Sequence, residues 1–251
     1  MKCIWCKKDH NSPSKEHIIP EPLGCPDGFL LTKGEVCLSC NNSLSHLDHA
    51  VIQDFDFLLF FNEIPRKSGK LPEISTRGNV IGYNKENEKV IFFNYDNKDK
   101  VSIDGRLAYP RGKSNRNVYA NFKDNGKVSF KSTIGADPKF TRGILKIAFS
   151  SMVYYFGASQ FLKAEYDSIR NYVVDGKGER KIILIPADDQ NYFNEVRLIP
   201  SNSGNEWLIQ LRLGYVQFLI DVTPDMSVFP LLKEKAKALY GDSGWTYLPI
   251  Q

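Results

Sequence analysis

The sequence is poor in histidine and cysteine, and it has no long apolar run. Its 251 residues include four histidines and five cysteines. A membrane-spanning helix needs roughly 20 apolar residues in succession, but the richest run here, residues 144–156, contains a lysine and two serines. The first ten residues have no apolar core of the kind found in secretion signals. We therefore expect a cytoplasmic protein with no membrane partner, whose cysteines stay reduced and bind metal instead of forming disulfides.

The basic residues are concentrated in the middle of the chain. Residues 63–146 contain 18 Lys and Arg against 9 Asp and Glu, whereas acidic residues outnumber basic ones both before and after this block. Such a local excess of positive charge favours a polyanionic partner, of which DNA is the first candidate. The alternative is a solvated basic surface that only maintains solubility.

The patterning predicts an α+β protein in two parts. Residues 1–62 are expected to form a small zinc-bearing module, which ends in a helix that starts at Asn41 or Asn42 and runs towards Phe61. Two prolines and a glycine in residues 64–73 indicate a linker. Residues 63–251 are expected to form a larger α+β domain with antiparallel sheet and helices, which docks or selects DNA.

Within that larger part, strands and helices follow one another in blocks. Short β-rich runs fill residues 74–135, and Asn125-Gly126 is a typical hairpin turn. Residues 137–172 are predicted to be helical in two pieces, with Asp137 and Pro138 at the start and Gly157 as the interruption. An antiparallel meander and a closing helix, ended by Gly241, complete the prediction.

Four of the cysteines indicate a zinc site. Cys3 and Cys6 form one C-x2-C pair, and Cys37 and Cys40 form another after 30 intervening residues. Two such pairs supply the four thiolates of a tetrahedral Zn²⁺ site. Since that site is complete without Cys25, we expect the fifth cysteine to be an ordinary loop thiol.

The residues around these pairs suit phosphodiester hydrolysis. Glu16 and His17 come directly before Ile-Ile-Pro, and Asn41 directly follows the last paired cysteine. This ordered set resembles the HNH endonuclease superfamily, the ββα-metal nucleases, and in particular its zinc-stapled branch, to which phage endonuclease VII belongs. The resemblance covers residues 3–55, about a fifth of the chain.

The resemblance implies a role for each of these residues. His17 would be the general base that activates water, while Glu16 and Asn41 would hold a catalytic Mg²⁺ or Mn²⁺, because such hard cations prefer oxygen ligands. It implies a DNA endonuclease, a hydrolase whose products end in a 5′-phosphate and a 3′-hydroxyl. By analogy alone, it suggests a role in restriction or another antiviral defence.

The sequence departs from the family pattern at two positions. Glu16 stands where many members have aspartate, and Ser45 stands where another common version has a second histidine. His46 and His49 lie nearby but off that spacing, and they remain weak candidates for contact with metal or phosphate.

The basic block supplies the candidate DNA contacts. These are Arg111, Lys113, Arg116, Arg142 and Lys146. The first three belong to a polar loop suited to phosphate oxygens, and the last two lie four residues apart, where they would form one basic edge of a helix. For each of them the alternative is simple solvation.

Three functions stay open at this point. The first is a DNA endonuclease, which would need a homodimer to cut both strands from one centre per chain. The second is a non-catalytic zinc protein that binds nucleic acid. The third is an RNA nuclease that uses the same site.

Overall fold

The computed structural model of the chain describes its two ends almost completely and its middle in part. The described residues are 1–72, 74–77, 80–85, 89–94, 102–103, 106–107, 115–122, 128–187, 193–200 and 207–249. Side chains are described outside residues 73–131 and 207. Contacts divide the chain into two compact units, one formed by Met1–Val51 with Asp137–Gln251 and the other by Ile52–Ala136. The sequence predicts a boundary between residues 62 and 63 instead. That this boundary separates a nuclease module from a DNA-docking domain stays a prediction.

The N-terminal residues form a short hairpin followed by a long helix. Strands β1 (Glu16–His17) and β2 (Leu30–Leu31) pair antiparallel, with the 3-10 turn η1 (Glu21–Leu23) between them. Helix α1 (Leu38–Phe61) confirms the predicted helix but begins three residues before Asn41. Asn41 therefore lies in the first turn, together with Cys40, and does not cap the helix.

Residues 137–175 form the predicted interrupted helical region. Asp137 caps α2 (Pro138–Phe156), since its Oδ1 accepts a hydrogen bond from the Lys139 amide at 2.9 Å. Gly157 ends this helix with a φ of 81°, a conformation that favours glycine. The short helix α3 (Ala158–Phe161), the 3-10 turn η2 (Ala164–Tyr166) and α4 (Asp167–Asp175) follow.

A five-stranded antiparallel sheet follows these helices and confirms the α+β class. Its strands are β10 (Ile182–Pro186), β11 (Asn194–Pro200), β12 (Trp207–Leu213), β13 (Val216–Asp221) and β14 (Thr246–Leu248). Their order is β11-β12-β13-β10-β14, so the expected meander holds for β11 to β13, whereas β10 pairs with β13 and not with its chain neighbour. Helix α5 (Phe229–Tyr240) stops at Gly241, as predicted.

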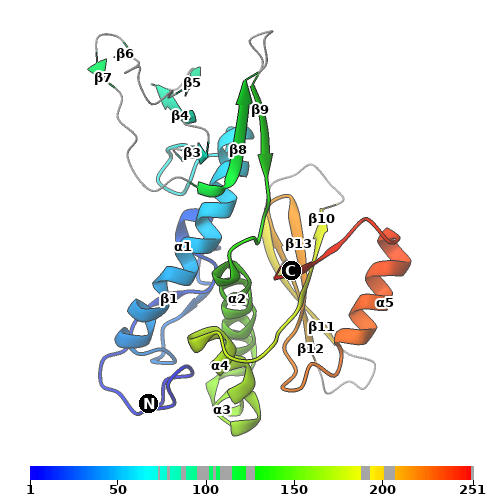
Figure 1. The fold of residues 1–251 in the computed structure, drawn as a ribbon. Coiled ribbons are helices and arrows are strands. Elements are labelled where there is room, and N and C mark those ends of the chain that lie inside the picture. Colours follow the sequence, from blue (N-terminus) through cyan, green and yellow to red (C-terminus); the bar gives the residue numbers. More distant parts are fainter. Residues whose placement is uncertain are drawn as a thin grey trace. The chain divides into compact units, whose positions relative to one another are not determined.

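This sheet lies between two helices, α5 on one face and α2 on the other (Figure 1). Ile183 and Ile185 of β10 pack against Leu232 and Ala236 of α5. On the opposite face, the ring of Phe218 lies 5.9 Å from that of Phe140 in α2. Side chains that alternate along the strands thus pack against α5 on one face of the sheet and against α2 on the other.

Helix α2 also packs against the N-terminal residues. The Trp5 ring lies 5.3 Å from that of Phe149, and the Phe29 ring lies 4.9 Å from that of Tyr154. At Gly143, an added Cβ would lie 2.6 Å from Val51 Cγ2, which is closer than Cβ contacts occur. Glycine therefore allows α1 and α2 to cross in close contact, and α2 borders the hairpin that contains Glu16 and His17.

The second unit contains the end of α1 and a second sheet. Its strands are β3 (Ile74–Arg77), β4 (Val80–Lys85), β5 (Lys89–Asn94), β8 (Asn115–Phe122) and β9 (Val128–Ser132), while β6 (Ser102–Ile103) and β7 (Arg106–Leu107) pair separately. The order is β5-β4-β3-β8-β9, and β3 and β8 run parallel. The antiparallel pairing of β8 with β9 confirms the predicted hairpin, although its turn, residues 123–127, lies outside the described residues.

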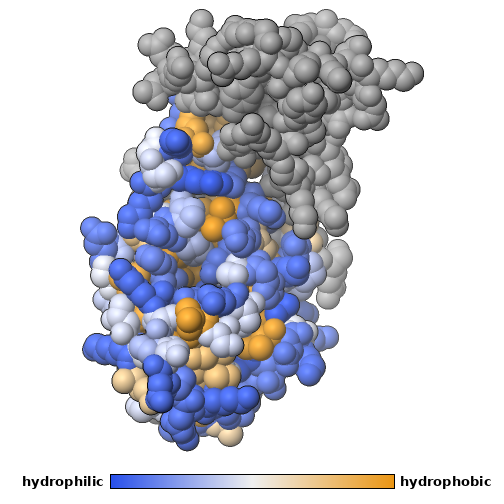
Figure 2. Space-filling model, turned by 90° about the vertical axis from the view of Figure 1, so that its left-hand side faces the viewer, coloured by the Kyte–Doolittle hydropathy of each residue, from blue (hydrophilic) through white to orange (hydrophobic). Residues whose placement is uncertain are grey.

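Over the part of the chain that the structure describes, no helix has the length and apolar character needed to cross a bilayer. On the face drawn in Figure 2, the coloured residues are mostly hydrophilic, and hydrophobic side chains form small separate patches among them.

Candidate functional site

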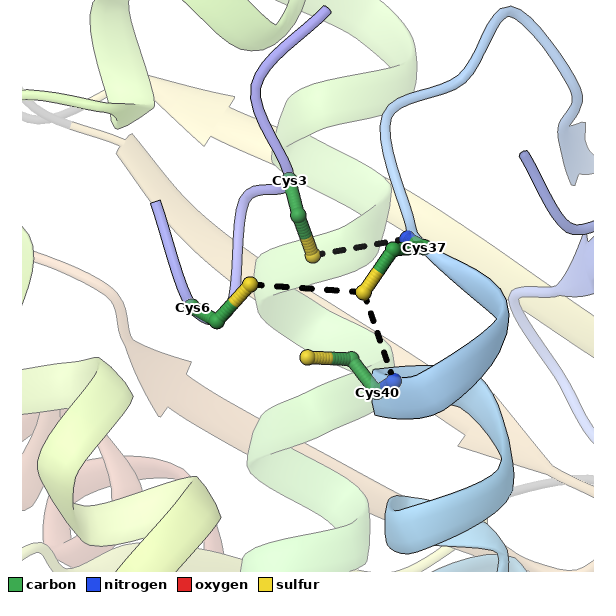
Figure 3. A group of neighbouring side chains, drawn as sticks. All are labelled: Cys3, Cys6, Cys37 and Cys40. Carbon is green, nitrogen blue, oxygen red and sulfur yellow. Dashed lines mark hydrogen bonds between the residues drawn. The ribbon is translucent and has the colours of Figure 1, made fainter. Parts of the chain in front are cut away.

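The two cysteine pairs converge on one point. The four Sγ atoms of Cys3, Cys6, Cys37 and Cys40 all lie within 4.8 Å of one another, and those of Cys6 and Cys37 are 4.0 Å apart. Figure 3 shows the first pair on the N-terminal loop and the second at the start of α1, with the side chains turned towards a common centre. Sulfur ligands at about 2.3 Å from a tetrahedral Zn²⁺ would be just under 4 Å apart. This four-cysteine cluster could therefore hold a metal ion such as zinc.

Backbone amides and burial shape the chemistry of the four-cysteine cluster. The Cys37 amide donates to Cys3 Sγ and the Cys40 amide donates to Cys37 Sγ, each at 3.4 Å. Burial raises the pKa of Cys3 and of Cys40. Burial acts in the same direction at Cys37, but hydrogen bonds from the Cys40 amide and from the other thiols outweigh it and lower the pKa of Cys37. Because metal ligation requires thiolates, ion binding releases protons, and the affinity must fall as the pH is lowered.

The side chain of His17 reaches the surface. Its side chain is 29% exposed, and Nε2 lies 3.9 Å from Glu21 Oε1. Strand β1 holds the backbone of His17 opposite Leu30, with Glu16 opposite Leu31. The imidazole is thus accessible to solvent and has a carboxylate neighbour, as a proton acceptor in hydrolysis requires.

Glu16 points the other way, into the protein, as expected for its neighbour on a strand. It is 2% exposed, and its Oε1 lies 3.2 Å from Lys146 Nζ and accepts a 3.4 Å hydrogen bond from Ser150 Oγ. Oε2 is buried and has no hydrogen-bond partner among the described residues. Burial raises the pKa of Glu16, and the Lys146 ammonium opposes this effect.

Lys146 does not form a basic edge on the surface, which corrects its prediction as a DNA contact. Its side chain is 1% exposed, and Nζ donates to Asp48 Oδ1 and Oδ2 at 2.9 and 3.0 Å. Burial alone would lower the pKa of Lys146, but the charges of Glu16 and Asp48 outweigh this effect and raise it. The residue is therefore a buried ammonium, because α2 packs against β1 and α1 and leaves this position no access to solvent.

Arg142 is likewise engaged within the protein. Its Nε and Nη2 donate to the Val173 carbonyl at 2.9 and 2.7 Å, and Nη2 also donates to the Val174 carbonyl at 2.7 Å. The guanidinium thus satisfies carbonyl groups in the last turn of α4. Because Lys146 is buried, Arg142 does not form the expected basic edge with it, and a DNA contact by Arg142 alone stays a prediction. Arg116 lies in β8, where its side chain is not described, and Arg111 and Lys113 lie outside the described residues.

Asn41 lies next to the strand that contains Glu16. Its Nδ2 donates to the Lys15 carbonyl at 3.4 Å, and the side chain is partly exposed. This contact uses the amide nitrogen of Asn41, so the amide oxygen is the atom that could act as a metal ligand. His46 Nδ1 donates to the Ser43 carbonyl at 2.8 Å within its own helix, and His49 is exposed. Neither histidine joins a group of potential metal ligands among the described residues, where the four-cysteine cluster is the one such group.

Asp48 places a second carboxylate beside Lys146, next to that of Glu16, and the motifs in the sequence did not indicate it. Asp48 follows Asn41 by seven residues, a spacing that places both on one face of a helix. That spacing was the available signal in the sequence. What the sequence could not supply is Lys146, because its approach depends on the packing of α2 against α1.

Comparison of the chain with protein-family models, with curated proteins and with solved structures gave no match.

Proposed function

We propose that the chain is a metal-dependent nuclease whose catalytic module is formed by residues 3–55. The observation that supports this most is the order and placement of three features. A ββ hairpin with a solvent-accessible His17 precedes helix α1, four cysteines join the start of that helix to the N-terminal loop, and Asn41 follows the last of them. This is the arrangement that the resemblance to HNH endonucleases implies.

Zinc is the ion proposed for the four-cysteine cluster. Four sulfur ligands are typical of structural Zn²⁺ sites and leave no open position for substrate. The role proposed for this ion is therefore to hold the hairpin against α1, and the reaction is assigned to other residues.

Glu16 and Asn41 are the proposed ligands of a second, catalytic cation. Glu16 offers Oε2, a buried acceptor that has no hydrogen-bond partner in the described part of the chain, and Asn41 offers an amide oxygen. These are the ligand types of Mg²⁺ and Mn²⁺, which retain several waters and need few protein ligands. When bound, such an ion supplies charge stabilisation at the scissile phosphate and at the leaving oxygen.

The chain's own residues would perform the proton transfer. In the proposed reaction, the imidazole of His17 accepts a proton from the attacking water, which its exposure allows. The Glu21 carboxylate, 3.9 Å from Nε2, then stabilises the imidazolium that forms. The products would end in a 5′-phosphate and a 3′-hydroxyl.

DNA is the proposed substrate because of the basic block at residues 63–146. With Lys146 buried inside the protein, the remaining candidate contacts are Arg111, Lys113, Arg116 and Arg142. RNA cleavage by the same site is the alternative within the enzyme class. A homodimer that cuts both strands, a cytoplasmic location and a role in defence remain parts of the proposal.

One observation favours a binding protein without catalysis. Glu16 already has a cationic partner, the buried Lys146, at 3.2 Å. If this ion pair satisfied the carboxylate fully, no divalent cation would be needed, and the module would be a zinc-stabilised scaffold that binds nucleic acid. The unpartnered Oε2 leads us to prefer the enzyme.

Cleavage assays distinguish these functions. The zinc-loaded chain is expected to nick plasmid DNA in Mn²⁺ or Mg²⁺ and to be inactive in an EDTA concentration that leaves the zinc content intact. The substrate is identified by comparing cleavage rates on matched duplex DNA, single-stranded DNA, methylated DNA, branched DNA and RNA. Labelling of the product ends checks for the 5′-phosphate. Binding without cleavage of any of these substrates would contradict the enzyme and support the binding protein.

A further inference from the structure

The buried carboxylate of Glu16 belongs to a group of three charged side chains, here called the charge triad: Glu16, Asp48 and Lys146. They come from three elements, β1, α1 and α2. Lys146 Nζ lies 3.2 Å from Glu16 Oε1 and 2.9 and 3.0 Å from the two oxygens of Asp48. One ammonium thus bridges both carboxylates, and three of the four carboxylate oxygens are in contact with it.

The fourth oxygen is Oε2 of Glu16. It is buried on a side chain that is 2% exposed, and no described residue forms a hydrogen bond with it. An unpartnered carboxylate oxygen in such a position is costly unless a further group satisfies it. With both carboxylates ionised, the charge triad also has a net charge of −1, and Asp48 is its most exposed member, with 25% of its side chain accessible to solvent.

We propose that Asp48 and Lys146 are positioning residues of the nuclease site, which hold Glu16 so that Oε2 alone is presented to the divalent cation. This inference rests on the proposed function. By binding Oε1, Lys146 fixes the orientation of the carboxylate, and by binding Asp48 it fixes its own ammonium. Ser150 contributes a further contact to Oε1 at 3.4 Å.

The proposal assigns part of the site to the C-terminal half of the chain. Lys146 and Ser150 lie on α2, outside the segment that resembles HNH nucleases. Residues 1–51 and 137–251 form one compact unit in which α2 packs against the N-terminal hairpin and α1. The site is therefore incomplete in residues 1–62 alone, and activity requires the full chain.

The charges of the triad provide a test that a merely structural role would fail. Asp48→Asn changes the net charge of the triad from −1 to 0, whereas Lys146→Met changes it from −1 to −2. By Coulomb's law, the Kd for Mn²⁺ should rise about tenfold or more in the first variant and fall by a similar factor in the second. The kcat should nevertheless fall in both, by about 100-fold, because the ion or the carboxylate is misplaced by about 1 Å. The KM for DNA should stay unchanged.

The experiment measures Mn²⁺ binding by electron paramagnetic resonance at pH 8 without nucleic acid, and kcat and KM on the best substrate. Zinc content and thermal midpoint are recorded for every variant. Arg180→Met is the matched control, because Arg180 is also a buried cation, 4% exposed, but its partners are Ser168, Thr223 and Pro224. It should lose stability without a change in Mn²⁺ affinity.

The outcomes separate this inference from the proposed function. Three results would overturn the positioning role: Kd shifts in the same direction for both variants, Kd shifts smaller than threefold, or a kcat of Lys146→Met equal to that of the control. The proposed nuclease function would survive these results if the wild type cleaves DNA. If the Kd for Mn²⁺ shifts in opposite directions in the two variants but the wild type cleaves no substrate, the cation site and its positioning residues stand and the nuclease function is overturned. A wild type that binds no Mn²⁺ overturns both. If Lys146→Met does not fold, Asp48→Asn, which retains the ammonium, decides by its Kd.

Discussion

A chain with Cys37→Ser is expected to lose its metal ion and the fold of residues 1–37 together. These residues contain little regular secondary structure, two strands of two residues each and one 3-10 turn, and the four-cysteine cluster links their first loop to the start of α1. A structural zinc contributes on the order of 10 kcal/mol to a small module. The expected loss is therefore comparable with the stability of a whole domain, which is about 5–15 kcal/mol.

Elemental analysis and limited proteolysis measure this effect. The wild type should contain one zinc per chain and resist cleavage between residues 8 and 36, whereas Cys37→Ser should contain none and be cut there. Cys25→Ser is the matched control, because Cys25 is buried too but donates to the Phe29 carbonyl at 3.3 Å, a contact that serine can make. A Cys37→Ser chain with a full zinc content and unchanged protease resistance would refute the zinc site.

Replacing His17 by alanine is expected to lower kcat by about 100- to 10,000-fold, the usual contribution of a general base. The stability should hardly change, because the side chain of His17 is partly exposed and its ion-pair partner Glu21 is half exposed. Single-turnover cleavage at saturating Mn²⁺ measures the rate of the chemical step. The KM for DNA should also stay the same, since His17 is proposed to act on water and not on the substrate.

His49→Ala is the control for this prediction. His49 is an exposed histidine on α1 and lies outside the proposed site, so its replacement should leave the rate unchanged. A His17→Ala chain that cleaves within threefold of the wild-type rate would remove the general base from the account, even if the metal dependence remained.

The sequence predicted the elements well because their signals are local. Four local features each depend on a few neighbouring residues: the helix that runs to Phe61, the cap at Asp137, the break at Gly157 and the end of α5 at Gly241. The cysteine spacing likewise sufficed to predict that the four thiols meet. The position of β10 beside β13, by contrast, depends on packing between distant segments, and local patterning contains no information about it.

The same distinction explains why the expected basic edge does not form. Arg142 and Lys146 belong to a charge-rich block of the sequence, and a count of charges predicts solvent exposure for both. Their actual partners, the end of α4 and the Glu16–Asp48 pair, are brought to α2 by tertiary packing, to which the close approach at Gly143 contributes. A buried lysine between two carboxylates is a feature that only the three-dimensional arrangement can reveal.

The central claim is that Glu16 and Asn41 bind one divalent cation within reach of His17. A crystal of the zinc-loaded chain soaked in saturating Mn²⁺, with anomalous scattering recorded at the manganese edge, tests this directly. The account predicts a manganese peak bound by Glu16 Oε2 and the Asn41 amide oxygen, and no such peak in Glu16→Gln crystals. Manganese bound elsewhere, with Glu16 contacting Lys146 and Ser150 alone, would contradict it.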